Sequence, residues 1–205
     1  MTIRAGQPWG GVGTLPEGGI IVGSDAEAGA ALADARRDRR PLPALGLTGG
    51  DLCRTLGGRR DAAALRSGPA TVVPVDLGEV LVDGRLQLFV AHVVVRGRSW
   101  WRGPITAVMN AQYLGRWDVA PRAHPNDGLV DVVELDAGVS MRERWQVWRR
   151  LPAGTHVPHP GLVVRRTEAM QLDGAGRHVW IDGVDRGPAR ALSIRVEADA
   201  LTCVV

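Results

Sequence analysis

Short apolar segments fill the chain after residue 70, and this pattern restricts the fold more than any other feature. Nine runs rich in Val, Ile and Leu are separated by turn residues, as is typical of β-strands. They are Thr71–Val75, Glu79–Val82, Arg85–Val95, Ile105–Asn110, Val130–Leu135, Leu162–Thr167, Met170–Leu172, Val179–Ile181 and Leu192–Glu197. Asp83-Gly84, between the second and third runs, indicates a hairpin. We therefore expect a mostly antiparallel, sandwich-like domain over residues 70–205, with one helix around Met141–Leu151.

Residues 1–69 show a different pattern. The apolar run Gly19–Gly23 predicts a buried strand, and Asp25 is expected to cap the helix that follows it. Leu42–Leu47 predicts a second strand, and Asp51 is expected to cap a short second helix. This β-α-β-α order is typical of a parallel sheet covered by helices. The chain is thus expected to be α+β, with a truncated α/β part before the larger β-rich part.

Composition excludes several classes of protein. The 205 residues contain no apolar run of 18, so no transmembrane helix is expected, and the irregular lead-in of residues 1–18 does not resemble a signal peptide. These features favour a cytoplasmic location, with Cys53 and Cys203 as buried free thiols. All 25 basic residues are Arg and the net charge is +3. An anionic partner or a coding bias toward Arg explains this, and no nucleic-acid motif accompanies it.

Two segments carry a family resemblance. Asn110–Leu135 reads NAQYLGRWDVAPRAHPNDGLVDVVEL, and Val179–Gly183 reads VWIDG. In this order they resemble the hallmark motifs of the diacylglycerol kinase and YegS-like lipid kinases, N…GG…aPxAxxxDGxLDvv and Asp-Gly-Glu. The resemblance covers about half the chain, from Ile105 to Val205. It implies an α/β nucleotide domain joined to an antiparallel β domain, acting on ATP and a lipid hydroxyl.

The resemblance also implies where ATP would bind. The family's GGDGT loop, whose amides cradle phosphates at a helix N-terminus, corresponds to Gly23-Ser24-Asp25-Ala26-Glu27. Gly23, Ser24 and Asp25 are therefore candidate cofactor-binding residues. Ala26 and Glu27 depart from the family's Gly and Thr, adding a Cβ and a carboxylate beside the expected phosphates.

A second nucleotide loop of the family, GTxND, corresponds to Leu47–Asp51. It retains Thr48, the fourth candidate for cofactor binding, but lacks the first Gly and the Asn. The βαβα units that precede the first loop in the family are missing here.

A magnesium site is implied at the Asp-Gly turn. By resemblance, Asp127 supplies a carboxylate, and His124 and Leu129 supply main-chain carbonyl oxygens, a donor set that suits a hard cation. The alternative interpretation is that residues 125–128 form only a tight turn before a strand.

The family's catalytic base is absent from its expected position. The Glu that follows Asp-Gly in the family is Val184 here, so no catalytic residue is assigned. Asp185 lies one residue along the strand, where its side chain would face the opposite way unless a bulge intervened.

Two further groups of residues allow more than one interpretation. His156 and His159, with His124, suggest a metal cluster, but hydrogen-bonded loop residues are the favoured explanation. Trp100-Trp101, beside Arg98 and Arg102, suggests a peripheral membrane contact, and internal packing is the favoured explanation.

Three hypotheses for function remain. The first is a catalytically impaired, pseudokinase-like module that binds nucleotide or lipid, or serves as a scaffold. The second is an active ATP-dependent phosphotransferase acting on a lipid hydroxyl. The third is a homo-oligomeric structural protein in which a second copy fills the missing region.

Overall fold

The computed structural model describes residues 9–59 and 61–205. Within them, eleven strands form one large sheet and two more form a small hairpin. The strands are β1 (Gly11–Gly13), β2 (Ile20–Val22), β3 (Leu45–Leu47), β4 (Ala70–Val82), β5 (Arg85–Phe89), β6 (His92–Arg96), β7 (Ile105–Met109), β8 (Tyr113–Leu114), β9 (Trp117–Asp118), β10 (Val130–Leu135), β11 (Leu162–Thr167), β12 (Ala169–Ile181) and β13 (Val184–Val204). The helices are α1 (Asp25–Arg37), α2 (Asp51–Thr55), α3 (Ala62–Ser67) and α4 (Met141–Arg150), which is followed by the 3-10 turn η1 (Leu151–Ala153).

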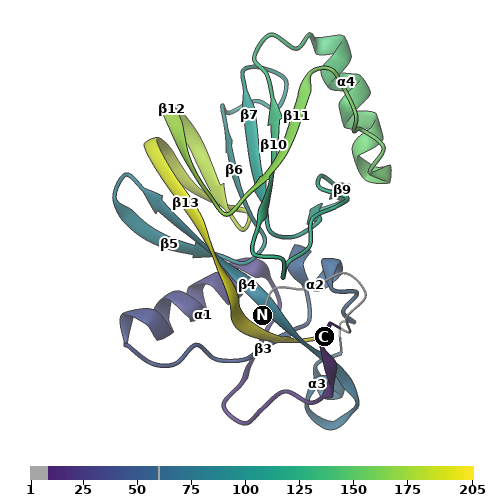
Figure 1. Cartoon of the computed structure of the whole chain (residues 1–205), viewed down its shortest axis with the longest axis vertical. Helices are drawn as coiled ribbons and strands as arrows, with labels where there is room; N and C mark the ends of the chain where they lie inside the picture. The colour runs from purple at the N-terminus through teal and green to yellow at the C-terminus, as the bar shows by residue number, and fades with distance from the viewer. Residues whose placement is uncertain (1–8, 60) are drawn as a thin grey trace.

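The large sheet folds over on itself to make a sandwich. Its main path runs β1-β4-β13-β12-β6-β7-β10-β11, with antiparallel pairing at every step. Figure 1 shows β5, β13 and β12 diverging from β6, β7, β10 and β11. Apolar side chains from both layers meet between them, including Val80 and Ile194 from one layer and Val108 and Val132 from the other. The expected α+β class with a sandwich-like β domain is confirmed.

The N-terminal part supplies the parallel portion of the sheet. β2 pairs with β3, and β3 pairs with the end of β13, in both cases in parallel. One apolar core joins Leu32 of α1 and Leu47 of β3 to Leu77 of β4 and Leu201 of β13. The sheet and this core both continue across residue 69. The division of the chain into two parts at that residue stays a prediction.

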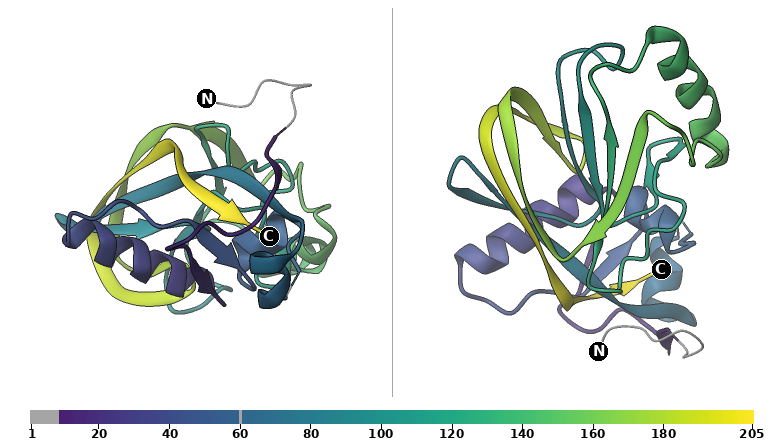
Figure 2. Two further views of the ribbon diagram at one scale, coloured as in Figure 1. Left: turned by 90° about the horizontal axis from the view of Figure 1, so that it is seen from below. Right: turned by 45° about the horizontal axis from the view of Figure 1, so that its top comes forward.

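The two long helices lie at opposite ends of the molecule. Figures 1 and 2 show α1 beside the lower strands and α4 beside the far end of β10 and β11. α4 begins with a reciprocal capping box in which the Ser140 hydroxyl accepts from the Glu143 amide and the Glu143 carboxylate accepts from the Ser140 amide. No helix in the described part of the chain is long and apolar enough to cross a membrane.

Several details differ from the sequence-based expectations. Two predicted pairs of short strands are each one long strand, β4 and β12, and β13 is much longer than Leu192–Glu197. Register shifts in β12 and β13 interrupt the apolar pattern without ending the ladder. The lead-in is not wholly irregular, because Gly11–Gly13 pairs with the edge of β4. α3, β8 and β9 were not expected at all.

Both helix caps were also placed wrongly. Ser24, not Asp25, caps α1, since its Oγ accepts from the Glu27 amide at 3.2 Å. Gly50 occupies the N-cap position of α2 and offers no side chain. The Asp25 carboxylate instead accepts from the amides of Asp51, at 2.5 Å, and Leu52, at 3.1 Å. The cap of α2 therefore comes from the first turn of α1.

Candidate functional site

The structure brings together the four residues expected to bind nucleotide. β2 and β3 are adjacent parallel strands, so the loops that follow them meet at one edge of the sheet. The Thr48 amide and hydroxyl both donate to the carbonyl of Val22, at 3.0 Å each. Gly23, Ser24 and Asp25 follow directly after that carbonyl. This clustering agrees with two loops that converge on one site.

A carboxylate of the chain itself lies at the N-terminus of α1. Glu27 Oε2 accepts a hydrogen bond from the Gly23 amide at 2.7 Å, while the Glu27 amide donates to Ser24 Oγ. Because a helix N-terminus carries a partial positive charge, Glu27 is stabilised in the position that the resemblance assigns to phosphate.

The two loops leave no room for larger side chains. Gly50 has a φ of 96°, and a Cβ there would lie 2.4 Å from Asp25 Oδ1. A Cβ on Gly49 would lie 2.3 Å from the carbonyl oxygen of Gly23. Glycine at both positions lets the α2 N-terminus close directly onto the start of α1.

A buried polar cluster lies behind these loops, around His92. Its Nε2 is 3.0 Å from Asp51 Oδ2. Burial lowers the pKa of His92, but the hydrogen bond to Asp51 and the negative charges of Asp182, Asp51 and Asp25 together raise it. Burial raises the pKa of Asp25, with its two amide hydrogen bonds acting in the opposite direction.

Asp182 anchors the strand β6 to the β12–β13 hairpin. Its carboxylate accepts from the amides of Val90, Ala91 and His92 at 2.9–3.0 Å. Burial raises the pKa of Asp182 to about 6, while the charge on His92 and the amide donors limit the rise. Asp182, which belongs to the VWIDG motif, thus holds the segment Val90–His92 in place through its backbone amides.

The position of the missing base lies on this same hairpin. Val184 pairs with Ile181 and Asp185 pairs with Trp180 across the turn. The Asp185 carboxylate lies 3.0 Å from His178 Nδ1 and accepts from the Gly187 amide at 2.8 Å. Asp185 is therefore engaged in the exposed part of the hairpin, as the side-chain alternation of a strand predicts.

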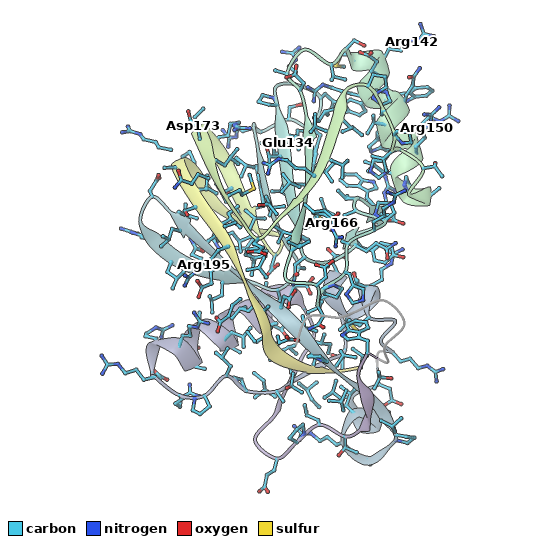
Figure 3. All side chains as sticks on the ribbon, viewed as in Figure 1. Glu134, Arg142, Arg150, Arg166, Asp173 and Arg195 are labelled. Atoms are coloured by element: carbon cyan, nitrogen blue, oxygen red, sulfur yellow. The ribbon has the colours of Figure 1, made fainter. Side chains whose placement is uncertain are left out.

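The three residues of the expected metal site lie along one turn. Asp127 Oδ1 accepts from the Leu129 amide at 3.0 Å, and Oδ2 forms an ion pair with Arg166 of β11. Arg166 is labelled in Figure 3. The His124 ring packs against Trp9, with 4.6 Å between ring centroids. Because the Arg166 guanidinium already neutralises the Asp127 carboxylate, a divalent cation at this turn would have to displace it. The metal assignment stays a prediction, and this ion pair argues against it.

The histidines do not come together as a metal cluster. No group of three or more His, Cys, Asp or Glu side chains suited to a metal exists in residues 9–59 and 61–205. His156 Nε2 is 3.0 Å from the Val119 carbonyl, and His159 Nδ1 accepts from the Gly161 amide. Hydrogen-bonded loop residues were the favoured interpretation of both.

Sequence reasoning missed a buried carboxylate next to this turn. Asp76 is fully buried in β4, and it accepts from the amides of Gly128, at 2.7 Å, and Asp199, at 2.8 Å. Burial raises its pKa to about 6. The available signal was an acidic residue within the apolar run VVPVDLG, where an unpaired charge would be costly.

A second missed feature is an apolar cavity of about 350 Å³ between α4 and the strands β7 and β10. Four tryptophans contribute to its wall, and its polar lining residues are Arg144 and His156. The lining includes Trp100, Trp101, Ile105, Ala107, Leu114, Trp117, Val133, Leu135, Val147 and Trp148. Both the volume and the apolar lining are typical of small-molecule sites.

Arg144 holds the wall of this cavity in place. It is buried in α4, and its guanidinium donates to the carbonyls of Val139, Gly103 and Asp136 at 2.6–3.1 Å. A fourth, longer bond of 3.4 Å reaches the carbonyl of Trp100. One side chain thereby connects α4 to the loops before β7 and after β10.

Comparison with known proteins identifies the family. Residues 77–205 match the family model of the YegS C-terminal NAD kinase beta sandwich-like domain. This match spans more than half of the chain, which therefore belongs to the diacylglycerol kinase and YegS-like lipid kinase superfamily. No curated protein matches the chain.

Solved structures show the same fold. A structure described as "a putative diacylglycerol kinase from Bacillus anthracis str. Sterne" aligns with a TM-score of 0.61 and 15% identity, covering 89% of this chain and 75% of that one. Another diacylglycerol kinase structure from the same organism gives a TM-score of 0.52 at 15% identity, covering 79% of this chain and 66% of that one. A third gives 0.56 at 14% identity, with coverage of 79% and 69%.

Proposed function

We propose that this protein is a lipid-kinase-like binding module that lacks phosphotransferase activity and holds an apolar ligand, such as a lipid acyl chain, in the cavity beneath α4. The observation that carries the first half of this proposal is the Glu27 carboxylate on the Gly23 amide, 2.7 Å away.

The position of Glu27 opposes nucleotide binding in two ways. The Gly23 amide already has an anionic partner, so a phosphate would have to displace it. A displaced carboxylate would still lie within a few ångströms of the phosphate, where like charges repel. The other expected contacts are also engaged, since the Thr48 hydroxyl donates to Val22 and the Asp25 carboxylate caps α2.

The base needed for transfer has no substitute on the β12–β13 hairpin. A general base must approach the acceptor hydroxyl within about 2.6–3.2 Å and accept its proton. Val184 has no such group, and the Asp185 carboxylate is held by His178 and by the Gly187 amide. Both observations support a protein that has kept the fold of a lipid kinase without its transfer chemistry.

The cavity supports the second half of the proposal. An apolar ligand of this size gains free energy from removal of its surface from water, at about 25 cal/mol per Å². Arg144 is already bonded to carbonyls, which leaves the walls suited to a hydrocarbon chain instead of an anionic group.

Two assays test the proposal. In the first, purified protein is incubated with radiolabelled ATP, Mg²⁺ and diacylglycerol, and we expect no product above the protein-free control. Lipid phosphorylation that disappears in Asp127→Ala would overturn the claim of inactivity and favour the active phosphotransferase.

In the second assay, binding of a fluorescent fatty acid is titrated. We expect saturable binding that weakens at least tenfold in Leu114→Trp, because Leu114 lines the cavity and the indole fills it. Leu86→Trp is the matched control, since Leu86 is 52% exposed on β5, away from the cavity. Absence of binding, or equal loss in both variants, would refute the cavity assignment.

A further inference from the structure

An exposed aromatic surface covers the outside of the cavity. Met141, Trp145 and Trp148 follow each other at positions i, i+4 and i+7 of α4, with exposed fractions of 59%, 46% and 37%. Trp101, 37% exposed, extends this stripe, with its ring centroid 6.2 Å from that of Trp148. We refer to these four side chains as the α4 face.

Arginines border the α4 face. Arg149 lies over the ring of Trp145, 4.7 Å from its centroid, and Arg116 lies 5.7 Å from that of Trp148. Arg142 and Arg150 extend from α4 away from the body of the molecule, as Figure 3 shows. Arg98 and Arg102 flank Trp101 in the preceding loop, and both are exposed.

The acidic groups near this surface are already engaged. Glu143 closes the capping box of α4 through Ser140, and Asp136 accepts from the Gly138 amide at 2.7 Å. Among the described residues, no carboxylate forms an ion pair with Arg142, Arg149 or Arg116. The surface therefore combines large amphipathic rings with uncompensated positive charge.

We propose that the α4 face docks on an anionic lipid bilayer. Tryptophan is favoured at the boundary between headgroups and acyl chains, where its ring is partly apolar and its N–H can be hydrated. Each arginine near an anionic membrane surface strengthens binding about fivefold. The side chains that would enter the interface and those that would meet lipid phosphates thus lie together on α4 and the loops beside it.

The docked α4 face would bring the cavity next to the bilayer. This part of the proposal rests on the proposed function, in which the cavity holds an acyl chain. Trp101 and Trp148 belong to the α4 face and also line the cavity, so the cavity borders the same surface. An acyl chain that leaves a bilayer beneath the α4 face would pass from hydrocarbon to an apolar cavity with little exposure to water.

Co-sedimentation with vesicles tests the docking. The whole protein is mixed with vesicles of phosphatidylcholine alone or with 30% phosphatidylglycerol, at low and high salt. We expect binding to the anionic vesicles that weakens as salt rises, and at least tenfold weaker binding to the neutral ones. Arg142→Glu/Arg149→Glu should weaken anionic binding at least 25-fold, and Trp145→Ala at least threefold.

Matched controls lie on the opposite side of the sandwich. Arg85→Glu/Arg190→Glu makes the same change of charge at exposed positions of β5 and β13, and Leu86→Ala removes an equally exposed apolar side chain. Both should bind as the unaltered protein does. Circular dichroism of each variant confirms that it is folded.

Brominated lipids provide a second, direct readout. Anionic vesicles that contain brominated lipids should quench tryptophan fluorescence. This quenching should be reduced in Trp145→Ala and unchanged in Leu86→Ala. No vesicle binding, or equal losses in the control variants, would overturn the proposal. So would dimerisation through the α4 face without vesicle binding, which would assign this face to a second copy of the chain. Vesicle binding without fatty-acid binding would refute the cavity half of the proposed function and leave the docking proposal intact.

Discussion

At the scale of single residues, three buried aspartates, Asp76, Asp131 and Asp182, have pKa values raised to about 6 by burial. In the unfolded chain the corresponding pKa is about 3.8. A raised pKa means that the folded state binds the proton more tightly. Each of these groups therefore disfavours folding above pH 6, and this cost disappears as the pH falls toward 4.

Asp131 offers a test of this effect, because burial raises its pKa although Arg166 Nε lies 3.5 Å from its Oδ2. Asp131→Asn removes the charge with little change in volume. At pH 8 we expect the free energy of unfolding to rise by about 2 kcal/mol. Two pKa units correspond to about 3 kcal/mol, and loss of the ionic contact with Arg166 offsets part of that gain. At pH 4.5 the difference should fall to near zero or reverse.

Urea denaturation at the two pH values measures both differences. Glu17→Gln, an exposed position, is the control and should change stability by less than about 0.5 kcal/mol at either pH. A difference between Asp131→Asn and the unaltered protein that is independent of pH would contradict the raised pKa.

At the scale of secondary-structure elements, the position of α4 depends on Arg144. Arg144→Met keeps most of the apolar stem but leaves the carbonyls of Val139, Gly103 and Asp136 without their buried donor. We expect a loss of about 3 kcal/mol in the free energy of unfolding.

Arg142→Met is the matched control for this change, because Arg142 is exposed on the same helix. It should change stability by less than about 0.5 kcal/mol. Equal effects of the two substitutions in a denaturant titration would show that the contacts of Arg144 contribute nothing to the attachment of α4.

The sequence predicted best those helices, strands and turns whose conformation depends on residues close together in the chain. Asp83-Gly84 makes the expected hairpin, with φ values of 46° and 82° that suit these two residue types. β2, α1 and β3 follow from apolar periodicity and their order along the chain. β1 could not be predicted, because Gly11–Gly13 is a strand only through its pairing with Ala70–Val72 of β4, which is distant in sequence.

Candidate site residues show the same difference between local and distant causes. Motif resemblance placed Gly23, Ser24, Asp25 and Thr48 in two loops, and the structure brings those loops together. The partners that determine their chemistry come from elsewhere. Asp25 caps a helix 26 residues away, and Arg166 reaches Asp127 from β11. Such contacts depend on tertiary packing and leave no signal in a single sequence.

At the scale of the whole molecule, the N-terminal part and the β sandwich share one core. Leu32 and Leu47 pack with Leu77 and Leu201 across the boundary at residue 69. We therefore expect a single cooperative unfolding transition in urea, with circular dichroism and tryptophan fluorescence giving the same midpoint. Two separated midpoints would instead indicate parts that unfold independently.

At the same scale, the central claim is that this protein has the fold of a lipid kinase but does not bind nucleotide. The fold is that of a lipid kinase, yet Glu27 lies where the phosphates of ATP are expected. Calorimetric titration of Mg-ATP to millimolar concentration tests this directly. We predict no saturable heat for the unaltered protein and measurable binding for Ala26→Gly/Glu27→Thr, while Glu17→Thr remains without binding. Saturable binding of Mg-ATP to the unaltered protein would contradict the claim that its own carboxylate has replaced the nucleotide.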